Sequence, residues 1–341
     1  MSQILDTFPQ LLLNSTKKIL DEQLPKDLLN STAKQCLETG FESIPLVSKQ
    51  LMDQINAVTA PELAEASLFM GQATLIGYSL ANSLKHLVGL GDSKDLAGRE
   101  TFSLGDTVSS LVLGSLTTEF FPEYGILDEE SGGIRLEKQK IFTIDPIDGS
   151  ISFTHCVDEA WAVGMALYDK TVVSANNSGI VASAIALPQQ EIKQQLVLGV
   201  VSSGCWDLAG EPQKVSLPSY VQNDVRRCVV SIGHKDMRSH IWDRGLQTLA
   251  EQAQRLYAGI DIQHAGALAA RGQIDVLIRS KQLPYDLAPI IGVVEAAGGK
   301  VLTFDQKIPK IPLDLTTEQH VVAWNGDKKL GDYLFELVNT P

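Results

Sequence analysis

Two aspartates lie three positions apart in the segment 142–150, with a proline between them and a glycine and a serine just after. An apolar run precedes them, so the sequence predicts that Asp145 and Asp148 lie where a strand ends and a turn begins. Pro146 fixes its own φ and Gly149 permits a tight turn, which would hold both carboxylates rigidly. Such carboxylates repel each other unless a cation lies between them, and oxygen ligands suit Mg²⁺, Mn²⁺ or Ca²⁺. Taken alone, the pair could also form a solvated turn.

Two more acidic clusters accompany this pair. Residues 128–130 are three consecutive carboxylates, followed by Ser131 and two glycines. Asp286 precedes an apolar stretch, 287–297, whose pattern is typical of a buried helix. Near the N-cap of that helix, free N–H groups and the helix dipole would stabilise an ionised carboxylate. Separately, the clusters are explained by a surface turn and a helix cap, but together with the first pair they indicate a site for divalent cations.

The order of these motifs resembles the inositol monophosphatase family of Mg²⁺-dependent, often lithium-sensitive phosphatases. Four segments carry the resemblance: Glu-Glu-Ser at 129–131, Asp-Pro-Ile-Asp-Gly-Ser at 145–150, Tyr-Asp-Leu-Ala at 285–288 and Glu-Ala-Ala-Gly-Gly at 295–299. Weaker likenesses lie at 103–106, ahead of a predicted helix, and at 204–216, which resembles a hairpin of the family. The likeness extends over residues 62–340 and implies a five-layered αβαβα sandwich.

The resemblance implies two neighbouring Mg²⁺ sites, with Mn²⁺ as a substitute. Glu129, Asp145 and the backbone carbonyl of Ile147 would bind one ion. Asp145, Asp148 and Asp286 would bind the other, so that Asp145 bridges the two ions. All these ligands are oxygen atoms, which are the ligands that Mg²⁺ prefers.

The resemblance also implies catalytic and substrate-binding roles. Glu129 and the Ser150 hydroxyl would orient the attacking water, and the backbone N–H groups of Gly149 and Ser150 would hold the phosphate. Asp286 would also contact the substrate, and Asp106 would support a third, weaker ion through water. Because water attacks phosphorus in line, the reaction needs no covalent intermediate.

Several positions depart from the family pattern. Asp128 replaces the usual glycine, and we expect its side chain to point to solvent. Ser150 replaces a threonine but keeps the hydroxyl, and Tyr285 replaces a tryptophan. The segment 97–102 fits poorly to the mobile loop of the family, which weakens the argument for a third ion.

The residues expected around the substrate leave its identity open. Seven positions before Asp286, the inositol phosphatases carry a glutamate that binds substrate hydroxyls, and this chain has Arg279. The guanidinium could bind a carboxylate or a second phosphate of the substrate, or it could pair with Asp275 and hold the loop. Asp261 could contact a substrate hydroxyl or amine, which resembles the histidinol-phosphatase branch. Capping of the predicted helix 263–271 is the preferred interpretation for Asp261.

The resemblance favours a phosphomonoesterase that hydrolyses a small phosphorylated polyol, with inositol monophosphate as the default substrate. The alternatives are a histidinol-phosphatase, or a sugar or nucleotide bisphosphatase of the same superfamily. Arg279 and Ser150 favour a bisphosphatase, whereas Phe153, His155 and the lack of a basic cluster disfavour it. Outside the enzymes, the chain could be a scaffold protein with a vestigial phosphatase body. The retained carboxylates argue against a scaffold, because a dead site has no physical need of groups that repel one another.

The composition limits which partners and which cellular compartment are expected. A formal net charge of −13 argues against nucleic acid and anionic membranes as partners, because both need a basic surface. The sequence has no apolar run as long as the ~18 residues of a membrane helix and no signal-peptide pattern. The four cysteines are scattered, which is typical of reduced thiols in the cytoplasm. Cys156 could be a nucleophile, but the complete set of carboxylates disfavours that role. The resemblance further implies a homodimer.

The chain is predicted to comprise a helical extension over residues 1–60 and a phosphatase domain over 61–341. Four extension helices are expected, at 4–13, 15–24, 26–39 and 44–58. Their apolar spacing predicts an amphipathic layer that docks on the domain, at a dimer interface or on another partner. Within the domain the expected strands are 141–145, 161–168, 179–187, 196–201, 255–258, 274–278 and 299–303, and the expected helices are 63–88, 240–253, 263–271 and 286–297. This mixed order indicates an α/β sandwich of layered sheets and helices, in agreement with an αβαβα fold that carries an extra N-terminal helical segment.

Overall fold

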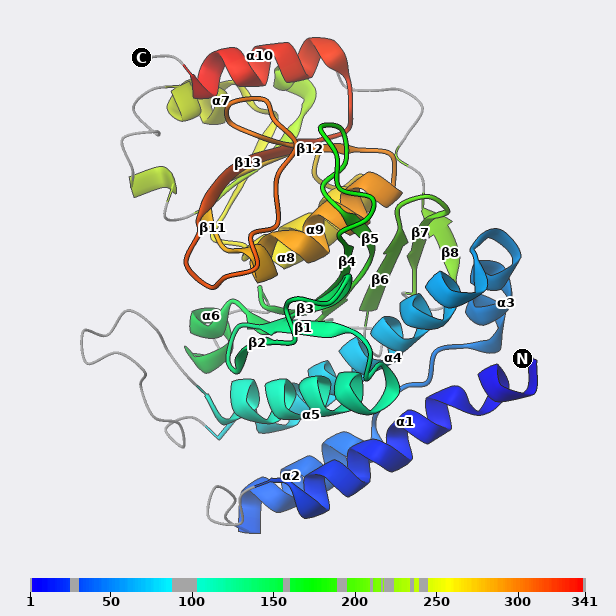
Figure 1. The fold of residues 1–341 in the computed structure, drawn as a ribbon. Helices are drawn as coiled ribbons and strands as arrows, with labels where there is room; N and C mark the ends of the chain where they lie inside the picture. The colour runs from blue at the N-terminus through cyan, green and yellow to red at the C-terminus, as the bar shows by residue number, and fades with distance from the viewer. Residues whose placement is uncertain are drawn as a thin grey trace.

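Layers of helices alternate with two β-sheets in this protein. The computed structural model describes residues 2–24, 31–87, 103–155, 160–188, 195–208, 211–215, 217, 224–233, 236–238 and 245–339. From the N-terminal side come an outer group of helices, a helix pair, an eight-stranded sheet, a second helix pair, a five-stranded sheet and a final helical layer (Figure 1). The predicted αβαβα sandwich with an extra N-terminal helical layer is confirmed.

The N-terminal half of the chain supplies the outer helices and the first helix pair. The outer helices are α1 (Ser2–Glu22), α2 (Ser31–Glu42) and α3 (Lys49–Val58). The pair that covers the first sheet consists of α4 (Pro61–Leu84) and α5 (Leu104–Phe120). Most of α4 is buried on all sides, as its nearly continuous apolar sequence predicts.

The first sheet has the strand order β2-β1-β3-β4-β5-β6-β7-β8. Its strands are β1 (Gly125–Asp128), β2 (Gly132–Ile134), β3 (Lys140–Asp148), β4 (Ala162–Asp169), β5 (Ile180–Leu187), β6 (Gln195–Val200), β7 (Gly204–Asp207) and β8 (Gln213–Val215). β3 pairs parallel with β1 and antiparallel with β4. Because β1 and β3 run in the same direction, the residues that follow them emerge at the same edge of the sheet.

The C-terminal half places two helices between the sheets. These are α8 (Ile262–Ala270) and α9 (Pro284–Ala296), and the short α6 (Ser150–His155) follows β3. The second sheet contains β10 (Arg255–Ala258), β9 (Val229–Ile232), β11 (Val276–Gln282), β13 (Gln319–Trp324) and β12 (Lys300–Thr303), in that spatial order. Its outer face is covered by α7 (Gln247–Gln252) and α10 (Lys328–Val338) (Figure 1).

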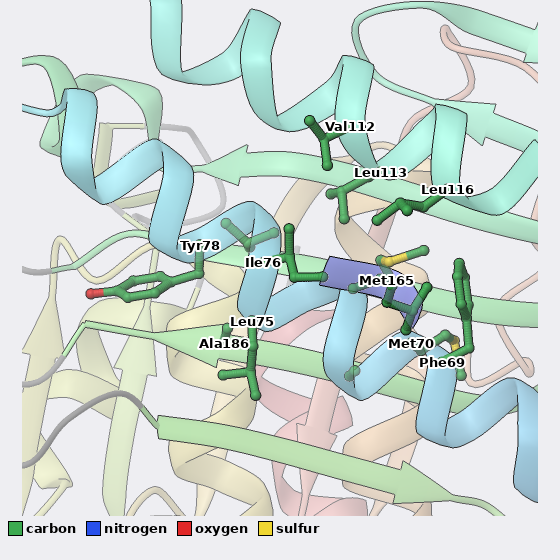
Figure 2. Packing of buried hydrophobic residues seen from close by; sticks show 14 of the residues in the cluster. Phe69, Met70, Leu75, Ile76, Tyr78, Val112, Leu113, Leu116, Met165 and Ala186 are labelled. Carbon is green, nitrogen blue, oxygen red and sulfur yellow. The ribbon is translucent and has the colours of Figure 1, made fainter. Parts of the chain in front are cut away.

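The apolar core falls into three clusters that follow these layers. Figure 2 shows the first cluster, in which Phe69 and Ile76 of α4 and Leu113 of α5 meet Met165 of the first sheet. The second cluster surrounds α8 and α9, and the third lies between the second sheet and α7 and α10. Burial on both faces holds each sheet between helices, so the strand ends are fixed relative to α8 and α9.

The outer helices belong to the same core as α4 and α5. Leu12, Leu37 and Leu51, one from each helix, are 0–4% exposed and lie in the first cluster. On α5, Glu119 accepts a hydrogen bond of 2.8 Å from the Ser15 hydroxyl of α1. The apolar face of this layer is therefore buried against the body of the same chain.

The boundaries of the outer helices differ from the predicted ones. The two helices expected at 4–13 and 15–24 form one helix, α1. It runs through Pro9 without a break, because the one hydrogen bond that proline removes is offset by the burial of the neighbouring Phe8 and Leu12. α3 begins at Lys49 and not at residue 44, since the Ser48 hydroxyl accepts the Leu51 N–H as an N-cap. The first part of the helix expected at 26–39 lies outside the described residues.

Within the domain, the predicted strands and helices agree with the structure to within a few residues, and the first part of the helix expected at 240–253 lies outside the described residues. β1, β2, β9, β13 and α10 were not predicted. Among the described cysteines, Cys36, Cys205 and Cys228 are free thiols, and Cys156 lies outside the described residues. In the part of the chain that the structure describes, no helix is long and apolar enough to cross a membrane.

Candidate active site

β3 carries the Asp145 and Asp148 pair into the interior. Its residues from 141 to 148 are buried, and the pairing with β4 shifts register between the two aspartates. The strand ends at Asp148, three residues later than predicted, and Gly149 then adopts a φ of +87°. A Cβ on Gly149 would lie 2.3 Å from Oδ2 of Asp261, so the turn requires glycine for its conformation and for its space.

Three of the predicted aspartates converge at this turn. Asp145, Asp148 and Asp286 each offer one carboxylate oxygen, and these oxygens all lie within 4.8 Å of one another. Asp286 is the third residue of α9, one turn inside the predicted cap position. Its Oδ2 accepts the Leu283 N–H at 2.9 Å, which closes the first turn of the helix and orients the carboxylate.

Glu129 reaches the same place from β1. It directly follows that strand, and its N–H donates to the Ile144 carbonyl of β3 at 3.2 Å. The negative charges of Asp286 and Asp106 raise the pKa of Glu129, and Glu129 in turn raises the pKa of Asp145. The structure thus brings all four predicted acidic ligands into one cluster.

Burial and mutual repulsion both act on this cluster. Burial is the larger cause that raises the pKa of Glu129, Asp145 and Asp148 well above their ordinary values. Repulsion from neighbouring carboxylates adds to the shift, and for Asp148 the largest such contribution comes from Asp261. Without a counter-charge these groups take up protons, whereas a bound cation would keep them ionised at neutral pH.

The donor set fits a hard divalent cation. The converging side chains offer only oxygen atoms, and two of them, Asp145 and Asp148, are buried. Oδ1 of Asp145 has no hydrogen-bond partner among the described residues, so it is available to a cation. Carboxylate oxygens in this arrangement suit Mg²⁺, Mn²⁺ or Ca²⁺ better than zinc, which favours nitrogen and sulfur.

The model of the inositol monophosphatase family matches residues 72–340. The chain belongs to this family. The family consists of metal-dependent phosphatases, and the chain is accordingly a phosphoric monoester hydrolase. The match covers β3, α8 and α9, which together carry the converging aspartates and their neighbours.

Relatives of the chain differ in substrate. It is 26% identical over 271 residues to the 3′-phosphoadenosine 5′-phosphate phosphatase of Mycobacterium leprae, covering 74% of this chain and 88% of that protein. It is 25% identical over 227 residues to the inositol-1-monophosphatase of Caulobacter vibrioides, covering 65% and 81% respectively. The structure of the inositol monophosphatase from Anabaena (Nostoc) sp. PCC 7120 superimposes with a TM-score of 0.64, at 20% identity, over 82% of this chain and 98% of that one. This last likeness supports the shared fold alone.

Asp128, where the family usually has glycine, does not point to solvent as predicted. Its side chain is fully buried, and both carboxylate oxygens lie 3.0 Å from the Ser110 hydroxyl of α5. Oδ1 also accepts the N–H groups of Glu130 and Ser131 at 2.7 and 3.0 Å. The prediction was wrong because these donors give Asp128 a buried place, where it fixes the turn that holds Glu129.

The residues predicted to hold phosphate and the first ion lie side by side. The Ser150 hydroxyl donates to the Ile147 carbonyl at 3.2 Å, so two groups with predicted roles are in direct contact. Ser150 is the first residue of α6, and the Phe153 N–H of that helix donates to the Gly149 carbonyl at 2.9 Å. Phosphate binding by the N–H groups of Gly149 and Ser150 stays a prediction.

Asp106 lies in the first turn of α5. Its Oδ2 accepts the N–H and the hydroxyl of Ser103 at 2.9 and 2.6 Å, forming a capping box. The side chain is buried, and its charge contributes to the raised pKa of Glu129. Asp106 is therefore near the cluster, and its support of a third ion stays a prediction. The segment 97–102 lies outside the described residues.

Arg279 is buried and 3% exposed. Its guanidinium donates to the Ile260 carbonyl and the Ser231 hydroxyl, both at 2.9 Å, while Asp275 accepts the Val229 N–H. Burial lowers the pKa of Arg279 to about 10, which leaves it charged at neutral pH. Contact between Arg279 and a substrate stays a prediction.

Asp261 occupies the N-cap position of α8, but its side chain makes no cap hydrogen bond. The Ser152 hydroxyl of α6 donates to its Oδ2 at 3.0 Å. The carboxylate thus faces the turn at Gly149, and the prediction of a capping side chain was wrong because Ser152 and this turn are the neighbours of the carboxylate.

Two residues near the site were missed by sequence analysis. Gln263 of α8 contacts the carboxylates of Asp145 and Asp148. Asp236, which is 1% exposed, accepts the N–H and the hydroxyl of Ser280, and its charge opposes the lowering of the Arg279 pKa. Neither residue belongs to a motif. Gln263 is one of two polar residues, with His264, in the mainly apolar helix α8, and this pattern was the one signal that could have identified it.

Proposed function

We propose that this protein is a Mg²⁺-dependent phosphomonoesterase that hydrolyses a small phosphorylated polyol, such as inositol monophosphate. The convergence of Asp145, Asp148 and Asp286 within 4.8 Å, beside Glu129, is the observation that supports it most directly. Phosphate ester hydrolysis requires an activated water and neutralisation of the charge on the phosphate oxygens. An oxygen-lined acidic cluster that retains divalent cations meets both requirements.

Residues of the chain would hold the metal as follows. Asp145, Glu129 and the Ile147 carbonyl form one ligand set, and Asp145, Asp148 and Asp286 form the other. When bound, the cation neutralises phosphate charge and lowers the pKa of water. Mn²⁺, which also prefers oxygen ligands, is the expected substitute.

The remaining groups orient the reactants. The Glu129 carboxylate and the Ser150 hydroxyl orient the attacking water. The N–H groups of Gly149 and Ser150 donate to phosphate oxygens. The missing side chain of Gly149 leaves room for the Asp261 carboxylate beside this turn.

A phosphorylated amino alcohol, as in histidinol phosphate, is the second candidate substrate. The Asp261 carboxylate lies against Gly149, at the turn predicted to hold phosphate. A substrate ammonium group near the ester would pair with this carboxylate, whereas a neutral polyol would only hydrogen-bond to it. A bisphosphate is less favoured, because the donors of Arg279 are directed to protein oxygen atoms.

Release of inorganic phosphate from a substrate panel tests the proposal. The panel holds inositol 1-phosphate, histidinol phosphate, fructose 1,6-bisphosphate and 3′-phosphoadenosine 5′-phosphate, each in millimolar Mg²⁺ with and without lithium. We expect Mg²⁺-dependent turnover with inositol 1-phosphate as the best substrate, and preference for histidinol phosphate would support the second candidate. No turnover together with no metal binding would favour a scaffold with a vestigial site. Residence in the cytoplasm, expected from the scattered cysteines, and a homodimer, implied by the resemblance, stay predictions.

A further inference from the structure

Gln263 bridges two of the metal-binding candidates from the other side of the cluster. It is the second residue of α8, and its side chain is fully buried. Its backbone N–H donates to Oδ2 of Asp148 at 2.6 Å, and its side-chain Nε2 donates to Oδ2 of Asp145 at 2.6 Å. Nε2 also lies 3.4 Å from the carbonyl of Tyr285, the residue before Asp286. One residue therefore contacts, directly or through a neighbour, all three converging aspartates.

Gly164 of β4 provides the space for this side chain. It pairs with Asp145 in the β3–β4 register, so the two residues face each other across the strands. A Cβ at Gly164 would lie 1.8 Å from Oε1 and 2.5 Å from Cδ of Gln263. The glycine lies in the middle of a buried strand, where glycine is unfavourable without a reason of this kind.

The amide oxygen of Gln263 indicates that packing alone does not explain why glutamine occupies this position. Its Oε1 is buried and has no hydrogen-bond partner among the described residues. A buried acceptor without a partner is unfavourable, and an aliphatic side chain of similar size would avoid that cost. Glutamine is therefore favoured at position 263 because its amide nitrogen donates a hydrogen bond to Asp145.

We propose that Gln263 is a positioning residue for the metal-binding carboxylates. By binding Oδ2 of Asp145, the amide fixes the carboxylate and leaves Oδ1, which has no hydrogen-bond partner among the described residues, for the cation. A glutamine suits this role, because a neutral donor orients the carboxylate without competing as a cation does. The inference rests on the metal site of the proposed function and does not depend on the substrate.

Titration calorimetry of the full-length protein with Mg²⁺, and separately with Mn²⁺, tests the proposal without a substrate. Gln263→Leu keeps the volume and removes the donor. Loss of a partner that orients a metal ligand commonly costs about 10–100-fold in metal affinity, and we expect a loss in that range. An affinity within about twofold of wild type in a folded Gln263→Leu protein would overturn the inference.

Gln72→Leu is the matched control. Gln72 is also fully buried on a helix, but its amide binds the backbone of Val47 and Pro45, far from the carboxylates in the sequence. This change should lower the melting temperature and leave Mg²⁺ affinity unchanged. Equal losses of affinity in the two variants would show that general destabilisation is the cause, and would also overturn the inference.

Gly164→Ala gives an independent variant in which Gln263 is retained. The added methyl group must displace the amide from Asp145, so Mg²⁺ affinity should fall as in Gln263→Leu. In a Gln263→Ala background the clash disappears, and Gly164→Ala should then have little further effect. Additive losses would contradict the proposed contact.

If the wild-type protein bound neither Mg²⁺ nor Mn²⁺, the proposed metal site itself would be wrong. Metal binding without turnover would contradict only the proposed substrate.

Discussion

A buried carboxylate needs hydrogen-bond donors or a cation beside it. Asp128 and Asp145, which lie on neighbouring strands, meet this need in different ways. Asp128 accepts hydrogen bonds from Ser110 and from two backbone N–H groups. Asp145 accepts one, from Gln263, and faces other carboxylates. Asp128 is therefore a fixed anchor for the turn at Glu129, while Asp145 depends on a cation to remain ionised.

Replacing Asp145 with asparagine tests its predicted role as the bridging ligand. Asp145→Asn removes a charge shared by both ion sites, so turnover should fall more than about 100-fold, beyond the usual cost of losing an orienting partner. The metal-free protein should be as stable as wild type or slightly more so, because repulsion falls. Phosphate release and thermal melting in EDTA measure the two effects. Near-normal turnover would contradict the ligand assignment.

Two substitutions at Asp128 separate its charge from its hydrogen bonds. Asp128→Gly restores the residue usual in the family but leaves the Glu130 and Ser131 N–H groups without their acceptor, so Mg²⁺ affinity should fall about tenfold. Asp128→Asn keeps an acceptor oxygen and should stay within about threefold of wild type. Calorimetry with Mg²⁺ gives both values. If the glycine variant binds as tightly as wild type, the anchor is unnecessary.

At the residue scale, local motifs predicted the converging carboxylates but not the residues that hydrogen-bond to them. Asp145 and Asp148 share one short segment with a proline and a glycine, so their chemistry is visible in the sequence. Gln263 and Ser110 carry no such signal, because only the packing of α8 and α5 brings them to the carboxylates. The burial of Asp128 could not be predicted for the same reason.

At the scale of elements, the N-terminal helices act as part of the core. Their buried leucines share one cluster with α4 and α5, and α5 carries Asp106 in its first turn. The helical spacing of apolar residues predicted an amphipathic layer, and burial of one face agrees with that pattern. Helix ends were less predictable, because Pro9 is accommodated by packing and Ser48 selects the start of α3.

A pair of leucines in this layer tests its contribution to stability. Leu51 of α3 is fully buried, so Leu51→Ala should lower the free energy of unfolding by about 2–5 kcal/mol. Leu46, just before α3, is 48% exposed, and Leu46→Ala should change the free energy of unfolding by less than about 0.5 kcal/mol. Urea unfolding measures both, and Mg²⁺ affinity should be unchanged in both. Equal effects would mean that the layer does not dock as described.

At the scale of the whole molecule, the acidic cluster links stability to pH and to metal. In the metal-free protein, Glu129, Asp145 and Asp148 have raised pKa values, so above the ordinary values of 4.5 and 3.8 the folded state binds more protons than the unfolded state. The stability that this provides is lost as the pH rises through the raised values. A divalent cation bound by the ionised carboxylates would oppose that loss.

We therefore expect the melting temperature in EDTA to fall as the pH rises above the ordinary values of 4.5 and 3.8 and through the raised ones, and the fall to be reduced or reversed in Mg²⁺. Burial raises the pKa of Glu295 to about 7, so this residue contributes a fall in the same direction. Glu295→Gln removes that contribution and should leave the difference between the two conditions intact. Identical pH profiles with and without Mg²⁺ would contradict a cation site at the cluster.

The position of α9 between the two sheets has a consequence for how the protein is made. Glu129 and Asp145 leave the ribosome well before Asp286, and Asp286 takes its place only when α9 packs between the sheets. A nascent chain therefore lacks part of the ligand set until most of both sheets has been synthesised. Binding of a divalent cation at the complete cluster would then mark chains that have completed folding, and a truncated chain would lack part of the cluster.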